Sequence, residues 1–245
     1  MIIDQLCDHE KALKTCCLLS KSWVPYAQKH LFKTITFTSS KGAAFWRERF
    51  PDPLKPPACY IRSLYFLCTG SITNEDSSWI RSFPAVVELK LLTNCDHIHK
   101  HGSNNLPALL RDLLPKVKSL EIQWESFTAQ EILAFICSFP ILENLRVWQI
   151  AGSQVGMNGT ISQPSTLPLF TGTLALLRMQ GFMRLLVELP GDFRFRKIET
   201  SPCEFGIITK LVEKSSATLE CIDIDFTGVS GKSCTFAPRQ LQYLI

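Results

Sequence analysis

The 245-residue sequence lacks any apolar run close to the ~20 residues that a membrane-spanning helix needs. Its 12 glycines and 14 prolines are scattered and show no period, which excludes a collagen-like chain. Only 20% of its residues are charged and 46% are hydrophobic, so the chain is too apolar to be disordered throughout. These absences predict one or two globular domains with a substantial core and no membrane association.

The sequence also has little net charge. The formal value is +4, and the excess lies entirely in residues 1–60, which hold nine Lys or Arg and five Asp or Glu. Residues 61–245 hold 17 of each kind. The isoelectric point of about 8.5 is lower than that of typical nucleic-acid-binding domains, so we predict no nucleic-acid partner.

Ten cysteines are present, but none forms a C-x-x-C pair and no signal peptide precedes them. Most lie within apolar runs, where a free cysteine acts as a small apolar side chain. This pattern predicts mainly buried, unpaired thiols in a reducing compartment, either the cytoplasm or the nucleus.

The first quarter of the chain predicts two helices, a strand and a stiff linker. Apolar residues at helical spacing indicate a helix over residues 4–21, and Pro25 suits the first turn of a second helix. The alternating residues 33–38 indicate a strand. Because residues 50–58 contain four prolines, we assign residues 39–60 to a Pro-rich connection.

From residue 61 onward a short strand-like phrase recurs, with two apolar residues two positions apart. The phrases are Leu64-Tyr65-Phe66, Leu89-Lys90-Leu91, Leu120-Glu121-Ile122, Leu145-Arg146-Val147, Leu177-Arg178-Met179, Ile198-Glu199-Thr200, Ile222-Asp223-Ile224 and a last one at Leu244. Their anchors lie 25, 31, 25, 32, 21, 24 and 22 residues apart, mostly within the range of roughly 20–29 residues for leucine-rich repeats.

Helix-like stretches separate these phrases. The clearest, residues 128–139, opens with a capping box between Thr128 and Glu131 and places Ile132, Phe135, Ile136 and Phe139 on one face. A Ser-Phe-Pro sequence precedes two of the strand phrases, at residues 82–84 and 138–140. Each unit is therefore predicted to consist of a helix that ends at a proline, a turn and a strand.

Such a unit cannot bury its apolar face alone, so neighbouring units must stack. The predicted fold is α/β, a leucine-rich-repeat-like solenoid over residues 61–245 with parallel strands on one face and helices on the other. The alternative is one α/β domain with a doubly wound sheet, which has the same alternation of strands and helices. Residues 151–172, which have no clear period, are expected to form a long loop.

Three groups of residues resemble metal-binding or nucleotide-binding sites, but none of the three patterns is complete enough to predict such a site. Metal-ligand residue types alternate from Cys95 to His101, but a strand would point them all to one face, which suits a row better than a tetrahedral cage. Residues Gly228–Ser233 resemble the end of a phosphate-binding loop, but Phe226 occupies the position at which that loop requires glycine. Asp223 and Asp225 fit the polar positions of an alternating strand. We therefore predict no enzyme activity, metal or cofactor, although an unrecognised enzyme on an α/β domain stays an alternative.

The remaining candidate is the sheet face that carries the polar residues between the apolar anchors. The predicted target-binding residues on this face are Lys90, Glu121, Arg146, Trp148 and Arg178. A solvated sheet face would explain the charges equally well. Trp148 differs, because a large aromatic beside Arg146 is the kind of anchor that binding surfaces use.

The segment Ala12–Trp23, followed by residues 30–35 (His-Leu-Phe-Lys-Thr-Ile), resembles the second and third helices of an F-box. In that motif a leucine-bearing helix leads to a hydrophobic pair, a small residue, a basic residue and Trp, and a Leu-aromatic phrase then enters a strand. Residues 1–38 are assigned to this F-box-like segment. Together with the divergent repeats, the chain resembles the F-box proteins of the mushroom group of fungi.

The resemblance implies a substrate-recognition subunit of an SCF-type cullin–RING ubiquitin ligase, which does no chemistry itself. Its F-box would bind a Skp-type adaptor, and through it a cullin, while its repeats bind the target protein. The implied adaptor-facing or supporting residues are Leu6, Leu13, Cys17, Leu18, Leu19, Trp23, Leu31 and Phe32. Their apolar helix faces exceed what so short a segment can bury alone. The alternative is that they pack against the first repeat.

The opening Leu-Pro phrase of the motif would lie before Met1, so the F-box is expected to be truncated at its N-terminus. The C-terminal Leu244-Ile245 falls within a strand phrase, which also suggests truncation. An alternative function is therefore a leucine-rich-repeat adaptor or scaffold that does not engage the ligase.

Overall fold

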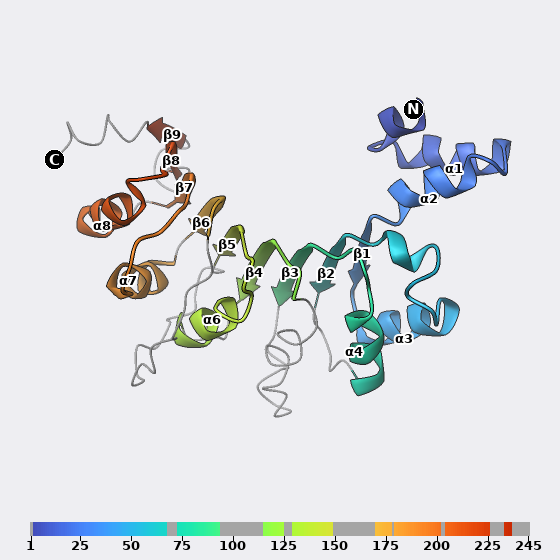
Figure 1. The fold of residues 1–245 in the computed structure, drawn as a ribbon, viewed down its shortest axis with the longest axis horizontal. Coiled ribbons are helices and arrows are strands. Elements are labelled where there is room, and N and C mark those ends of the chain that lie inside the picture. Colours follow the sequence, from blue (N-terminus) through green and yellow to red (C-terminus); the bar gives the residue numbers. More distant parts are fainter. Residues whose placement is uncertain are drawn as a thin grey trace. The chain divides into compact units, whose positions relative to one another are not determined.

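The computed structural model describes residues 2–67, 73–93, 115–124, 129–148, 170–177, 179–201, 204–225 and 233–236. The chain divides into two compact units, residues 1–116 and 117–245. Strands alternate with helices in both units (Figure 1), which confirms the predicted α/β class.

The first unit begins with three short helical segments. They are the 3-10 helix η1 (Ile2–Leu6) and the α-helices α1 (Glu10–Leu19) and α2 (Val24–Leu31). The predicted single helix over residues 4–21 is therefore wrong, because the chain turns between η1 and α1. This turn allows Ile3 to pack against Leu13, Cys16 and Ala27, whereas a continuous helix would hold Ile3 about 15 Å away from Leu13.

The sheet of the first unit consists of parallel strands in chain order. Its elements are β1 (Thr34–Phe37), α3 (Ser40–Arg49), the 3-10 helix η2 (Ala58–Tyr60), β2 (Ser63–Leu67), α4 (Asn74–Arg81) and β3 (Glu88–Thr93). Strand β1, which the sequence analysis placed with the F-box-like segment, pairs along its whole length with β2, and β2 pairs with β3. Helix α3 lies where the sequence predicted only a Pro-rich connection.

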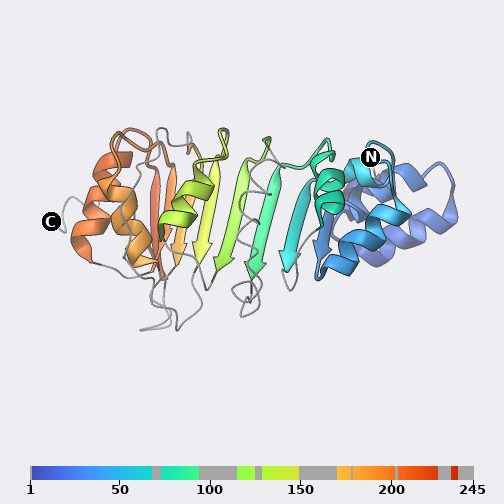
Figure 2. The same cartoon turned by 90° about the horizontal axis from the view of Figure 1, so that it is seen from below.

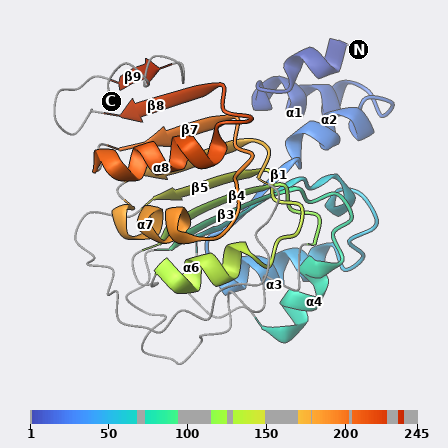
Figure 3. The same ribbon diagram turned by 60° about the vertical axis from the view of Figure 1, so that its left-hand side comes forward.

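The second unit repeats this arrangement. Its elements are β4 (Ser119–Trp124), α6 (Ala129–Ile136), β5 (Asn144–Trp148), β6 (Thr173–Leu177), α7 (Gln180–Glu188), β7 (Lys197–Thr200), α8 (Phe205–Ser215), β8 (Cys221–Asp225) and β9 (Ser233–Phe236). Strands β4 to β8 pair in parallel and in chain order, and β9 is antiparallel to β8. Helices α7 and α8 lie side by side (Figure 3).

Helices α3 and α4 in the first unit, and α6, α7 and α8 in the second, cover one face of their sheet (Figures 1 and 2). The strands on that face contribute buried anchors such as Leu64, Leu89, Leu120 and Leu145. Strands in chain order with helices on one side form a solenoid-like arrangement in each unit, and they exclude the doubly wound alternative, which reverses strand order and places helices on both faces.

The same hydrogen-bond pattern links successive repeats. The carbonyl before a strand accepts two N–H groups from the chain entering the next strand. Lys118 O, for example, accepts from Glu143 N at 2.8 Å and Asn144 N at 2.9 Å, and Lys33, Arg62, Gly172 and Arg196 do the same. The repeat predicted from leucine spacing is therefore also a repeat of backbone geometry.

The strand phrase Leu177–Met179 was predicted wrongly. Strand β6 ends at Leu177, and Met179 is instead the buried residue before α7. The strand anchor is Leu174, which pairs with Leu145 on one side and Ile198 on the other. The spacing between these partners is 29 residues and then 24, which is more regular than the sequence suggested.

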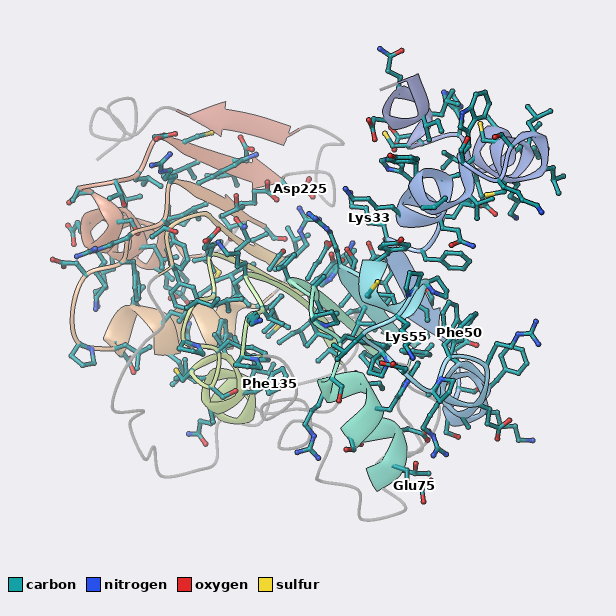
Figure 4. All side chains as sticks on the ribbon, turned by 45° about the vertical axis from the view of Figure 1, so that its right-hand side comes forward. Lys33, Phe50, Lys55, Glu75, Phe135 and Asp225 are labelled. Atoms are coloured by element: carbon teal, nitrogen blue, oxygen red, sulfur yellow. The ribbon has the colours of Figure 1, made fainter. Side chains whose placement is uncertain are left out.

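Helix α6 confirms the predicted apolar face up to Ile136, where it ends three residues earlier than predicted, so Phe139 follows the helix. Ile132, Phe135, Ile136 and Phe139 are all buried, and the rings of Phe135 (labelled in Figure 4) and Phe139 meet edge to face at 5.0 Å. The proposed capping residue Thr128 and the expected loop 151–172 lie wholly or largely outside the described residues.

The cysteines differ from their expected role. The six described as free thiols include only one fully buried side chain, Cys16, while Cys7 is exposed and the others are intermediate.

Candidate interaction surfaces

The N-terminal helices form a small core of their own. Leu13 is 1% exposed and packs with Ile3, Cys16 and Ala27, while Leu6, Cys17 and Leu31 are partly buried against this cluster. Four of these residues were predicted to face the adaptor, namely Leu6, Leu13, Cys17 and Leu31. They instead pack inside the helical segments and stabilise them as part of the core.

A side-chain hydrogen bond joins η1 to α2. His30 Nε2 lies 3.0 Å from Asp4 Oδ1. The hydrogen bond with His30 is the main reason that the pKa of the Asp4 carboxyl lies below its usual value. The contact joins residues 26 positions apart and so helps to hold the three helical segments together.

The turn between α1 and α2 exposes the remaining apolar residues of the motif. Leu18 is 88% exposed, Leu19 69% and Trp23 43%, and Tyr26 adds a ring that is 50% exposed. We call these four residues the apolar patch. Sequence reasoning missed Tyr26, although its i,i+3 spacing from Trp23, the N-cap residue of α2, could have revealed it.

The last predicted adaptor residue, Phe32, has an internal role instead. Its ring meets that of Trp46 on α3 edge to face at 5.9 Å, and Trp46 contacts Phe50 in turn at 4.9 Å. For Phe32 the structure therefore matches the alternative in which the motif packs against the first repeat.

The second candidate surface is the open face of β4 to β8 in the second unit. Burial alternates as predicted along β4, β5, β7 and β8, whereas Leu174, Ala175 and Leu176 of β6 are all buried. In β5 the anchors Leu145 and Val147 are buried, while Arg146 is exposed and Trp148 partly exposed. The predicted target residue Glu121 is the register partner of Arg146 and is partly exposed. Arg178 lies outside the described residues.

Ion pairs cross the open face. The guanidinium Nη2 of Arg146 lies 3.3 Å from Oε2 of Glu199 on β7. The ammonium Nζ of Lys197 lies 2.9 Å from Oε1 of Glu199 and 2.5 Å from Oδ2 of Asp223 on β8. Hydrogen bonds to Asp223 and then to Glu199 raise the pKa of the Lys197 ammonium. Between β5 and β7 lies Ala175 of β6, which is only 1% exposed because the Arg146–Glu199 pair spans it.

An apolar pair adjoins this ionic row at the carboxyl ends of the strands. Trp148 of β5 pairs in register with Leu177 of β6, and both are partly exposed. The indole Nε1 of Trp148 is buried and has no hydrogen-bond partner within the described part of the chain. Leu177 was not recognised as a face residue because the strand containing it was misplaced.

The first unit carries Lys90 on the corresponding face of β3. Its ammonium lies 4.7 Å from the centre of the Tyr65 ring on β2, a cation–π contact. In the register pair two residues earlier, Ser63 Oγ of β2 donates a hydrogen bond to Glu88 Oε2 of β3 at 2.6 Å.

The candidate chemical sites lie mostly beyond what the structure describes. Cys95 to His101 and Gly228 to Lys232 fall outside the described residues, and among the described ones no group of three or more metal-ligand side chains occurs. Asp223 and Asp225 are polar positions of β8, as the alternation predicted. No described helix is long and apolar enough to cross a membrane.

Comparison with known proteins identifies no relative: no family model, curated protein or solved structure matches this chain. The F-box resemblance thus remains a prediction, and function has to be argued from the two surfaces.

Proposed function

We propose that this chain is a substrate-recognition subunit of an SCF-type cullin–RING ubiquitin ligase. In this proposal the α1–α2 pair binds a Skp-type adaptor, and the adaptor connects the chain to a cullin. The open strand faces bind the target protein through Lys90, Glu121, Arg146 and Trp148, with Arg178 as a further expected contact. The proposed compartment is the cytoplasm or the nucleus, where free thiols such as the six described here stay reduced.

The apolar patch carries the proposal. Eight large hydrophobic side chains are exposed in the described part of the chain, and four of them fall within residues 18–26. The other four, Phe45, Leu54, Val87 and Ile141, are scattered along the sequence. Single exposed apolar residues are ordinary, whereas a cluster of this kind marks an interaction site.

The patch can supply enough binding free energy for a specific contact. Complete burial of one Leu or aromatic side chain contributes about 1.5–3 kcal/mol. Leu18 and Trp23 together would thus contribute about 3–6 kcal/mol, although ordering of the interface offsets part of this. The core residue Leu13 cannot contribute in the same way, because it is already buried.

The test is binding of the full chain to a purified Skp-type adaptor, measured by calorimetry. Replacing Leu18→Ala and Trp23→Ala together should weaken binding by about a hundredfold or more, because both side chains lose buried area. A matched control, Phe45→Ala with Leu54→Ala, removes one aromatic and one leucine side chain that are exposed (65% and 67%) outside the patch and should leave affinity unchanged. Absence of binding by the native chain, or equal losses in both variants, would refute the proposal.

The alternative is a repeat protein that binds its target without the ligase. The packing of Phe32 against Trp46 favours it, because part of the F-box-like motif is used inside the fold. This alternative predicts that the native chain shows no affinity for the adaptor.

A further inference from the structure

The charges around the apolar patch carry information about its partner. Residues 11–47 contain six lysines and one arginine but no Asp or Glu. The three acidic residues before them, at positions 4, 8 and 10, cannot balance this stretch. Acidic residues return only at Glu48.

Two of those three acids are already engaged locally. Glu10 pairs with Lys14 along α1, and Asp4 bonds with His30. Both contacts lie at the end of α1 and η1 that is away from the α1–α2 turn. The Glu10 contact offsets the charge of Lys14, which lies one turn before Leu18, and the Asp4 contact involves no lysine.

Three other lysines near the patch have no such partner. Lys11, Lys21 and Lys29 are exposed and make no ion pair or hydrogen bond with their side chains within the described residues. Lys33, labelled in Figure 4, follows Phe32, the C-cap residue of α2, and is exposed as well. An unpaired ammonium on a surface is free to interact with an incoming charge.

Helical spacing places these lysines on the same stripes as the patch residues. On α1, Lys11 is seven residues before Leu18, so the two lie on one face two turns apart. Trp23 at the N-cap of α2, and Tyr26 and Lys29 within α2, follow one another at intervals of three. Lys21 lies within the turn that joins the helices. Apolar side chains thus lie at the turn, and the three ammonium groups belong to residues within the turn or on the same helix stripes.

We propose that the apolar patch and the ring formed by Lys11, Lys21 and Lys29 bind a partner surface made of an apolar strip bordered by carboxylates. This inference rests on the proposed function and names the chemistry of the partner at the same site. The patch holds the complex through buried apolar area, while the lysines steer association, because charges at the rim of an interface act mainly on the association rate.

A pair of designed helical peptides tests this chemistry directly. Both carry the same leucine face, but one has Glu on both flanks and the other has Lys. The full chain should bind the Glu peptide at least about tenfold more tightly at low ionic strength, because unscreened charge attraction acts there over roughly 30 Å. At 0.15 M salt, where the range falls to about 8 Å, the preference should shrink.

Two variants with the same change in net charge locate the effect. Lys11→Gln, Lys21→Gln and Lys29→Gln together should reduce the preference to less than about threefold. Lys41→Gln, Lys116→Gln and Lys210→Gln together remove three exposed lysines outside the ring and should preserve it. Equal binding of the two peptides by the native chain, binding of neither, or equal effects of the two variants would each overturn the inference.

The Skp-type adaptor then separates this inference from the proposed function. The ring variant should lower its association rate about tenfold at low salt and change its dissociation rate little. If the adaptor does not bind but the preference for the Glu peptide and its loss in the ring variant are seen, the proposed function is wrong and the inference stands. If the adaptor binds at a rate that neither salt nor the ring variant changes, the inference is wrong and the proposed function stands.

Discussion

Replacement of Gly172 by alanine tests the strand register on which the target-binding face depends. Gly172 precedes β6, and a Cβ atom added to it would lie 2.1 Å from Asn144 Oδ1 and 2.9 Å from the carbonyl oxygen of Glu143. The backbones approach closely here because Gly172 N donates to Glu143 O at 2.9 Å. Asn144 Oδ1 also accepts from Thr173 N at 2.8 Å. An alanine would displace Asn144 and break that hydrogen bond.

The expected loss can be estimated from these two effects. Overpacking of a close contact costs about 1–3 kcal/mol. Loss of the acceptor for the half-buried Thr173 N–H costs about 1–3 kcal/mol more. A hydrogen bond from water to this N–H would offset part of that cost. Gly172→Ala should therefore lower the free energy of unfolding by about 2–4 kcal/mol. Adding Asn144→Ala removes the nearest clashing atoms, so the double variant should lose about 1–2 kcal/mol less than the sum of the two single variants.

Urea unfolding of the full chain measures these differences, with a shift of the midpoint at constant slope as the expected result. Gly206→Ala provides the control, because Gly206 lies in α8 with no atom within 4 Å of an added Cβ. That variant should be about 0.4–1 kcal/mol more stable than the native chain. If Gly172→Ala matches native stability, Gly172 does not contact Asn144, and the pairing of Trp148 with Leu177 loses its support.

Two other predictions separate buried from exposed groups. In urea titrations Leu13→Ala should lower the free energy of unfolding by about 2–5 kcal/mol, because it leaves a cavity in the core. Leu18→Ala should change the free energy of unfolding by less than about 0.5 kcal/mol, because Leu18 is exposed. Similar losses in the two variants would contradict the division into core and patch. Burial raises the pKa of the Cys137 thiol to about 11, so at pH 8 only about one molecule in a thousand carries the reactive thiolate. Mass spectrometry after iodoacetamide treatment should show the exposed Cys7 modified well before Cys137, and the reverse order would refute this.

Periodicity predicted the elements whose burial is strongly one-sided. Helix α6 presents Ile132, Phe135 and Ile136 to the core at helical spacing, and β5 alternates buried and open positions, so both could be located from the sequence. Helix α3 could not be found in this way. Its only fully buried residue is Ala43, and it is started by Ser39, whose hydroxyl accepts from Gly42 N at 3.3 Å.

Strand β6 was misplaced for a reason that lies in its neighbours. Its sequence, Thr-Leu-Ala-Leu-Leu, does not alternate, because Ala175 occupies an open-face position where a polar residue would be expected. The structure shows that Arg146 and Glu199 cover Ala175 from the strands on either side. A contact between residues 53 positions apart leaves no local signal in the sequence.

Charge pairing distinguishes the two proposed binding surfaces. On the open face, Arg146 and Lys197 are already paired with Glu199 and Asp223, so a target that engaged them would first have to disrupt or desolvate existing ion pairs, with little net gain. Trp148 has no such contact to break, and its buried Nε1 gains an acceptor if the target supplies one. The binding free energy of a target on this face should therefore come mainly from Trp148 and Leu177, while the ion pairs fix the positions of the strands that carry them.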